Sequence, residues 1–315
     1  MLSNILNIKH PIIMAPMFLV TNSKMMIEAL NNGIAGCIPA LNFRTTQDLD
    51  NALDTIREKS LSSTGLGVNL IANKSNFKLE EQLQICIKNK VSFIITSLGN
   101  PKKIIQECKK NHIKVFCDVV DLKYALKVEE LGADALIAVN KSAGGHAGKM
   151  SAEELIATLQ SSCKIPVISA GGIGTSKQIS HILNCGAIGV SIGSPFIACH
   201  EADISTEYKQ ACVDYSAEDI VMTTKISGTP CTVINTPYVK KVGTNQNIIE
   251  KLLSRNKKIK KWVKRFTFYY GMKTISKSAF SSTYKTVWCA GPSIQHTNKI
   301  MSVQDIIKKL TSNTS

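Results

Sequence analysis

One histidine of this chain lies between glycines, in the segment 143–148 that reads Ala-Gly-Gly-His-Ala-Gly. The imidazole of His146 is the side chain best suited to proton transfer near neutral pH. Gly144 and Gly145 tolerate positive φ and let the backbone approach a planar ligand closely. These residue types predict a catalytic or binding loop. They also fit a surface turn with an incidental histidine, because glycine-rich turns are common.

Two more glycine-rich segments follow, at residues 169–174 (Ser-Ala-Gly-Gly-Ile-Gly) and 191–194 (Ser-Ile-Gly-Ser). Each comes directly after an apolar run. Glycines there expose backbone N–H groups, which bind phosphate well at the start of a helix. Together the two segments predict a phosphate site, although glycine at such a turn is often purely conformational.

The elements that position these loops form an eightfold alternation between residues 11 and 196. Apolar, β-branched runs predict strands at residues 11–17, 35–40, 65–72, 91–98, 114–120, 133–140, 165–171 and 187–192. Amphipathic stretches predict helices at residues 23–32, 45–59, 79–89, 101–111, 121–131, 151–161 and 176–185. Parallel strands covered by helices have this pattern, and eight units predict a (β/α)8 TIM barrel. A doubly wound sheet is the alternative, but residues 15–18 lack its G-x-G-x-x-G turn.

In such a barrel the loops that follow the strands gather at one face. His146 follows the sixth predicted strand, and the two glycine-rich segments follow the seventh and eighth. We therefore expect the histidine and the phosphate site to lie at the same end of the barrel.

The rest of the chain predicts three parts: a barrel at residues 1–196, a mostly helical, basic insertion at 197–285 on the substrate side, and a segment 286–315 that returns to the barrel. Within the insertion we expect helices at 207–215 and 248–270 and an irregular stretch at 222–237, with a last helix near 303–310. Residues 238–285 contribute +12 of the net charge of +15. The basic face of 248–270 fits a solvated surface best, with an anionic membrane surface or nucleic acid as lesser alternatives.

Composition narrows the class of protein. Hydrophobic residues make up 44% and charged residues 19% of the chain, which is typical of a globular enzyme. The ten cysteines contain no C-x-x-C pair, which predicts reduced thiols and a cytoplasmic protein. No signal peptide or membrane-spanning run is visible. No metal site is expected, because the other histidines lack ligand spacing; they are His10, His112, His181, His200 and His296.

Taken together, the motifs resemble the FMN-dependent nitronate monooxygenases and the related flavin enoyl-acyl-carrier-protein reductases. The resemblance covers most of residues 8–200. It rests on the segments 11–17, 67–70, 132–135, 143–148, 165–173 and 186–194, which occur in the family's order. The combination of A-G-G-H-x-G with P-V-I-x-A-G-G-I is the specific part.

The resemblance implies FMN as cofactor and a role for each matching position. His146 would be the proton-transfer residue, as a base or as a hydrogen-bond donor. The residues expected to bind FMN are Ala15, Pro16 and Met17 along the flavin ring, Asn69 as a hydrogen-bond partner, Gly144 and Gly145 against the cofactor, and Ala170, Gly171, Gly172, Gly193 and Ser194 around the phosphate.

Three positions depart from the family's pattern. Asn140 stands where members often carry Gln or Glu, Asp118 where some carry a basic residue, and Ser194-Pro195 where many read Thr-Arg. Asp118 would disfavour an anionic reduced flavin or substrate. It would alternatively bond the ribityl chain, and we count it among the cofactor-binding residues.

The resemblance implies oxidation of nitronates or nitroalkanes with O2 to a carbonyl compound and nitrite. An NAD(P)H-dependent reductase acting on enoyl thioesters or quinones is the alternative, with an acyl carrier protein docking on the basic face. A third possibility is a non-catalytic flavin-binding or membrane-surface protein. The expected partners are a small-molecule substrate and O2, without nucleic acid.

Overall fold

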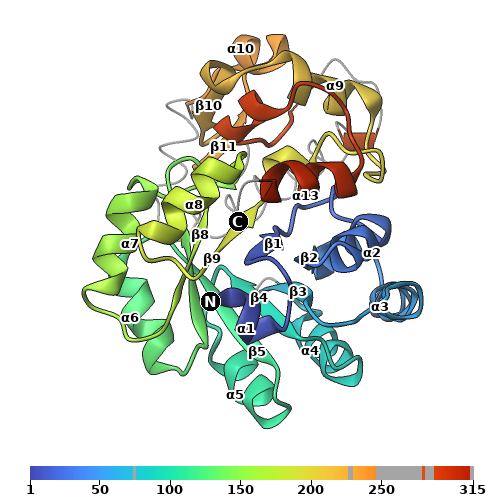
Figure 1. The fold of residues 1–315 in the computed structure, drawn as a ribbon, viewed down its shortest axis with the longest axis vertical. Helices are drawn as coiled ribbons and strands as arrows, with labels where there is room; N and C mark the ends of the chain where they lie inside the picture. Colours follow the sequence, from blue (N-terminus) through green and yellow to red (C-terminus); the bar gives the residue numbers. More distant parts are fainter. Residues whose placement is uncertain (74–75, 226–229, 246–278, 281–286, 313–315) are drawn as a thin grey trace, which may run out of the picture.

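Eight parallel strands close into a barrel in this computed structural model, in the order β1-β2-β3-β4-β5-β6-β8-β9 (Figure 1). The structure describes residues 1–73, 76–225, 230–245, 279–280 and 287–312. The strands are β1 (Ile12–Met14), β2 (Ala35–Pro39), β3 (Leu66–Ile71), β4 (Phe93–Ser97), β5 (Lys114–Val119), β6 (Ala135–Val139), β8 (Val167–Ala170) and β9 (Gly189–Ile192). Each predicted run contains one of these strands, so the predicted TIM barrel is confirmed.

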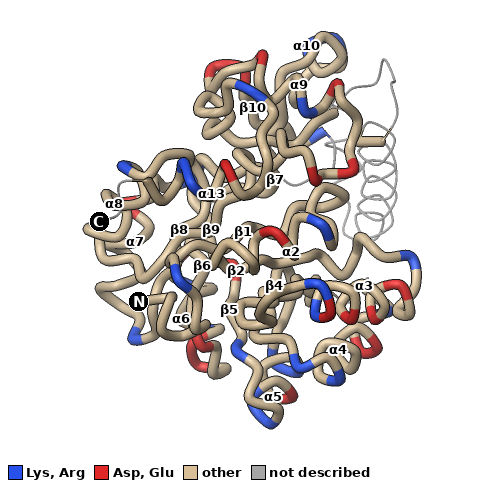
Figure 2. The backbone as a smooth tube through the Cα atoms, turned by 45° about the vertical axis from the view of Figure 1, so that its right-hand side comes forward, with Lys and Arg blue, Asp and Glu red and all other residues tan. Residues whose placement is uncertain are grey.

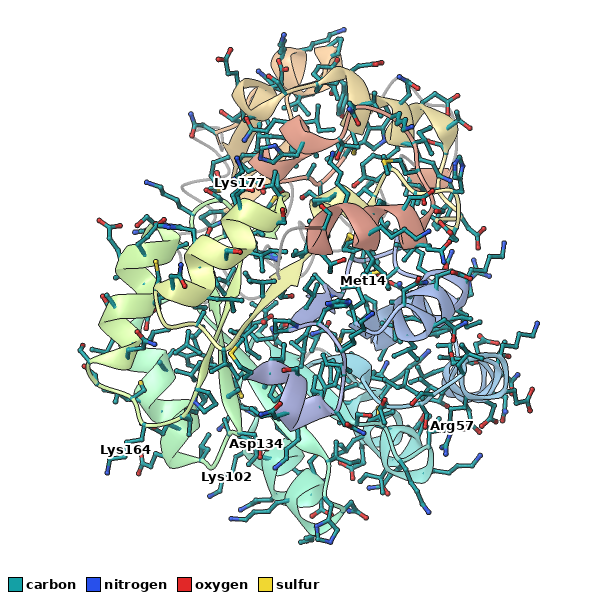
Figure 3. The ribbon with its side chains drawn as sticks, in the orientation of Figure 1. Met14, Arg57, Lys102, Asp134, Lys164 and Lys177 are labelled. Atoms are coloured by element: carbon teal, nitrogen blue, oxygen red, sulfur yellow. The ribbon has the colours of Figure 1, made fainter. Side chains whose placement is uncertain are left out.

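Helices surround the barrel on its outer face. They are α2 (Ser23–Asn31), α3 (Thr46–Lys59), α4 (Leu79–Lys88), α5 (Lys102–Lys110), α6 (Leu122–Glu130), α7 (Ala152–Gln160), α8 (Ser176–Asn184) and α13 (Val303–Thr311). The last of these packs against both α8 and α2, so it fills the place of the eighth barrel helix. Charged residues lie mainly on the helices and loops (Figure 2). In Figure 3 Lys102 and Lys164 mark the periphery, whereas Met14 of β1 lies in the apolar layer between the strands and the helices.

The barrel interior is apolar at one end and polar at the other. Helix α1 (Leu2–Leu6) closes the end where the strands begin, with Leu2 and Leu6 buried. Above it the rings of Phe93 and Phe116 stack with centroids 5.2 Å apart. Side chains of a strand alternate between its two faces, so Ser97, two residues after buried Ile95, also points into the barrel. The polar end of the barrel is therefore the end where the strands finish.

After β9 the chain leaves the barrel and returns. The described elements there are η2 (Ser194–Phe196), α9 (Thr206–Asp214), η3 (Ala217–Asp219), β10 (Ile220–Thr223), β11 (Cys231–Ile234), α10 (Pro237–Val242) and η4 (Pro292–His296). The helices predicted near 207–215 and 303–310 are confirmed. The predicted basic helix at 248–270 lies outside the described residues.

One prediction for the insertion is wrong. Residues 222–237 were expected to be irregular, but they contain β11 and the end of β10, so the described part of the insertion mixes helix and strand. β11 pairs on one side with β10 and on the other with β7 (Gly145–His146), which lies 85 residues earlier in the chain. So short a strand with so distant a partner carries little local signal.

The cysteines form no disulfide, and most of them are buried, in agreement with the prediction of reduced thiols. Among the described helices, none combines the length and apolar character needed to cross a membrane.

Candidate active site

His146 is held in a small sheet and does not hang in a free loop. Its strand β7 pairs antiparallel with β11, with Cys231 opposite His146 and Thr232 opposite Gly145. Directly opposed residues of an antiparallel pair extend to the same face of the sheet. The imidazole therefore projects on the same side as Cys231, which belongs to a buried apolar cluster with Val233 and Val287.

The surroundings of His146 keep its ring neutral. The residue is exposed to solvent at the rim of the barrel, yet protein encloses it on enough sides that burial lowers its pKa below the usual 6.5. No ion pair to His146 occurs in the described part of the chain. A neutral imidazole at physiological pH can accept a proton, which is what a general base requires.

Asn140 ties the histidine loop to the loop after β8. Its side chain is buried, its Nδ2 donates to the carbonyl oxygen of Gly171 (3.0 Å), and its Oδ1 accepts from the backbone N–H of Ser142 (2.8 Å). The residue noted as a departure from the family's pattern thus has a structural role here. It fixes the distance between the two loops that would border a ligand.

Glycine is required at two positions of the loop after β8. Gly171 and Gly172 have φ of +113° and +79°. A Cβ on Gly171 would lie 2.6 Å from the backbone nitrogen of Ala143, and one on Gly172 would lie 2.9 Å from the Cβ of Ser142. The pair therefore serves close packing against the histidine loop as well as any contact with a ligand.

Gly193 has room for a side chain that the protein does not use. Gly193 has φ of −114°, and a Cβ there would only touch Ala15 and Met17, at 3.5 Å. Within the described residues, no protein group accepts a hydrogen bond from the backbone N–H of Gly172, Gly193 or Ser194. Unpaired amides at one place bind anions, so these three positions fit the phosphate of a flavin nucleotide. Ala170, directly before Gly171, ends β8 beside them.

The turn after β1 offers an apolar surface. The N–H groups of Ala15 and Met17 donate to Ile192 (2.8 Å) and to the hydroxyl of Thr21 (3.0 Å), and Pro16 has no N–H. No backbone donor therefore remains in the segment 15–17 for a ligand. If a flavin ring lies here, it does so through van der Waals contact.

Asn69 and Asp118 are joined by a residue that the sequence did not single out. Asn69 Nδ2 donates to the carbonyl oxygen of Ile95 (3.1 Å) and to Ser97 Oγ (2.8 Å), and Ser97 Oγ donates to Asp118 Oδ2 (2.5 Å). Because Ile95 can only accept here, the orientation of the Asn69 amide is fixed. Both amide hydrogens of Asn69 and the hydroxyl proton of Ser97 are donated within the protein. Asn69 and Asp118 therefore offer acceptor oxygens, and no donor, to a ligand.

Burial raises the pKa of Asp118 to about 6, although the hydrogen bond from Ser97 opposes the shift. A raised pKa means that the folded protein holds this proton more tightly than the unfolded chain does. Stability from this group is therefore lost as pH rises from about 4 to 6 and stays lost above that range.

We expect Asp118→Asn to gain stability relative to wild type as pH rises. The difference in the free energy of unfolding should be about 1 kcal/mol more favourable to the variant at pH 7.5 than at pH 5. Urea denaturation of the cofactor-free proteins at the two pH values measures it. A difference in the free energy of unfolding that does not change with pH would contradict the raised pKa of Asp118.

Comparison with known proteins identifies the family. The family model described as nitronate monooxygenase matches residues 76–313, about three quarters of the chain. The chain belongs to the nitronate monooxygenase family. It is thus an oxidoreductase of a family of flavin enzymes.

Several known proteins are moderately similar in sequence to this chain. A probable nitronate monooxygenase of Staphylococcus aureus is 26% identical over 76% of this chain and 79% of its own length. The (3aS,4S,5R,7aS)-5-hydroxy-7a-methyl-1-oxo-octahydro-1H-indene-4-carboxyl-CoA dehydrogenase of Rhodococcus jostii is 25% identical over 78% of this chain and 69% of its own. The structure of FabK from Thermotoga maritima superposes with a TM-score of 0.84 at 27% identity, covering 99% of this chain and 94% of that one.

Three contacts of this nitronate monooxygenase family member escaped the sequence reasoning. Ser97 joins Asn69 to Asp118, Thr232 contacts the histidine loop, and Gly291 crosses Gly144. A Cβ on Gly144 would lie 3.0 Å from both the Gly291 nitrogen and Ser194 Oγ, and the Gly291 N–H donates to that oxygen (2.8 Å). The bare face of Gly144 therefore packs the returning chain, whereas Gly145 faces open space with φ of +76°. The only sequence signal for this close approach is that both positions, 144 and 291, are glycine.

Metal ligands do not converge in the described residues, where no group of three or more His, Cys, Asp or Glu side chains could hold an ion.

Proposed function

We propose that this protein binds FMN at the end of the barrel where the strands finish and oxidises nitronates or nitroalkanes with O2. The observation that carries the proposal is the position of His146, a neutral imidazole on a loop that is tied through Asn140 to unpaired amides suited to a phosphate. Residues 1–196 form the FMN-binding barrel, and the insertion at 197–285 forms the substrate side.

Several residues fit the shape of FMN. The amides of Gly172, Gly193 and Ser194, beside Ala170 and Gly171, would hold the phosphate. Ser194 Oγ accepts from Gly291, so its own proton is available to a phosphate oxygen. Dipoles of N–H groups replace the arginine found there in many members of the family.

The residues that would contact the flavin ring lie at the ends of other strands of the same face. Ala15, Pro16 and Met17 give it an apolar contact, and Gly145 leaves open space beside it. Asn69 and Asp118 present oxygens that accept from N–H or ribityl O–H groups, which are donors that FMN carries.

His146 performs the proton step. Its neutral ring accepts the acidic hydrogen of the carbon that bears the nitro group, and the imidazolium that forms is then solvated at the exposed rim. The bound flavin supplies the electron transfer between the resulting anion and O2. A substrate that arrives as the nitronate has already lost this proton and needs His146 only as a hydrogen-bond donor.

One experiment tests the proposal against its alternative. We expect purified protein to be yellow and to release FMN on denaturation, and we expect a nitronate to reduce it under anaerobic conditions while NADH does not. Oxygen uptake with a nitroalkane, without NAD(P)H, should accompany this. A colourless protein that cannot be reconstituted with FMN would contradict the cofactor and the activity together.

A second function rests on a different observation. The likeness to FabK and the similarity to a dehydrogenase of a CoA thioester favour an NAD(P)H-dependent flavin reductase that acts on enoyl thioesters. Rapid bleaching of the flavin by NAD(P)H, with no reduction by nitronate, would support this function. An acyl carrier protein is a partner only in that case.

A further inference from the structure

Thr232 reaches from the insertion to the loop that carries His146. Its side chain is 4% exposed, and its hydroxyl donates to the carbonyl oxygen of Ala143 at 2.7 Å. A second carbonyl oxygen, that of Gly145, lies 3.4 Å away. The hydroxyl thus touches the peptide groups on both sides of the Gly144-Gly145 pair.

Within the histidine loop, the glycine pair Gly144-Gly145 has the weakest conformational preference of its own. Glycine populates positive and negative φ about equally, and Gly145 adopts +76° with no neighbour that a Cβ would meet. The orientation of the Gly145 carbonyl fixes the direction in which the next residue, His146, leaves the backbone. A hydrogen bond to this segment therefore bears directly on where the imidazole points.

β11 is itself held by both the insertion and the segment that returns to the barrel. The Ile234 N–H donates to the carbonyl oxygen of Trp288 (2.9 Å), and Val233 is buried with Val239 and Val287. The position of Thr232 is therefore set by contacts of β11 with the insertion and the returning segment, and the barrel supplies only the loop that Thr232 contacts.

We propose that Thr232 is a positioning residue for His146, so that a strand of the insertion forms part of the catalytic architecture. This inference rests on the proposed role of His146 in proton transfer. It adds a residue outside the barrel, 86 positions from the histidine, on which that role depends.

The test compares three variants with wild type. Thr232→Val keeps the shape and loses the hydroxyl, and Thr232→Ser keeps the hydroxyl. Thr223→Val is the matched control. Thr223 is a buried threonine of neighbouring β10 that Cys231 separates from His146 in the sheet, and its hydroxyl donates to the carbonyl oxygen of Thr244 (3.0 Å) and not to the histidine loop.

We expect Thr232→Val to lower kcat for a neutral nitroalkane by about 10- to 100-fold, which is less than the full contribution of a general base because His146 is displaced and not removed. Its KM and its kcat for the preformed nitronate should change by less than about threefold. Thr232→Ser and Thr223→Val should both remain near wild type. Equal losses with both substrates, or an equal loss in Thr223→Val, would overturn the inference, because a merely structural defect does not distinguish protonated from deprotonated substrate.

A second measurement keeps the inference testable if neither substrate turns over. The ring signals of His146 in NMR spectra, assigned by their absence in His146→Ala, report its pKa and tautomer without catalysis. We expect Thr232→Val to shift that pKa and Thr232→Ser and Thr223→Val to leave it unchanged. An unchanged pKa in Thr232→Val would overturn the inference even where the activity proposal has failed. Should Thr232→Val not fold, Thr232→Ala takes its place in both measurements.

Discussion

Replacing His146 with alanine is expected to lower turnover of a neutral nitroalkane by about 100- to 10,000-fold, the range that a positioned general base contributes. The activation barrier rises because the variant lacks the imidazole that accepts the proton from carbon. A preformed nitronate bypasses that step, so its oxidation should stay within about tenfold of wild type. Steady-state oxygen uptake with the two forms of one nitro compound measures the contrast.

The pH dependence of the wild-type protein follows from the same histidine. Burial lowers the pKa of His146, so the ring is neutral at pH 7 and stays neutral above it. Turnover of a nitroalkane should therefore be level between about pH 7 and 8 and fall only below about 6.5 as the base becomes protonated. His181→Ala is the matched control, since His181 pairs with Glu153 on the outer helices. Full activity of His146→Ala on the neutral substrate would remove the assignment of the base.

Adding a methyl group at Gly193 is expected to weaken FMN binding by about 10- to 100-fold, equivalent to about 1.4–2.8 kcal/mol. The backbone there has φ of −114°, which alanine adopts readily, and the new Cβ would only touch Ala15 and Met17 at 3.5 Å. The fold should therefore tolerate Gly193→Ala. FMN binding should be weakened, because the new methyl group would occupy space beside the unpaired amides of Gly193 and Ser194, where the phosphate is proposed to bind.

Fluorescence titration of the cofactor-free protein with FMN measures this affinity, and the urea midpoint of the same cofactor-free variant serves as the control for folding. Gly172→Ala is a poorer test, because φ of +79° and a contact of 2.9 Å with Ser142 predict a loss of stability as well. Unchanged FMN affinity in a stable Gly193→Ala protein would place the phosphate elsewhere.

The barrel was predictable because its signals are local. Each strand is a short β-branched run and each helix an amphipathic stretch, so patterns within about ten residues specify them. The glycine-rich loops were predictable for the same reason. Asn69 and Asp118 were singled out through the resemblance to the flavin family, but the hydroxyl of Ser97 between them belongs to no motif.

The support of the histidine was not predictable from local patterns. Thr232 contacts Ala143 across 89 residues, and Gly291 crosses Gly144 across 147. Such contacts depend on how the segments after β9 fold back onto the barrel. The spacing of apolar residues along the sequence does not predict this. Pro230 and Pro237, on either side of β11, favour a loop by local pattern, whereas the pairing of β11 with β7 and β10 makes the segment a strand.

The returning segment has a consequence for how the protein is made. Helix α13 packs between α8 and α2, and Gly291 lies against the histidine loop, so the returning segment completes both the helix layer and the support of His146. A nascent chain that has reached only residue 285 carries all eight strands but leaves the apolar sides of α2 and α8 uncovered. Such exposed apolar surface is prone to aggregation. The ribosome must therefore also synthesise residues 287–311 before the barrel has its full layer of helices and the loop with His146 has the contact with Gly291.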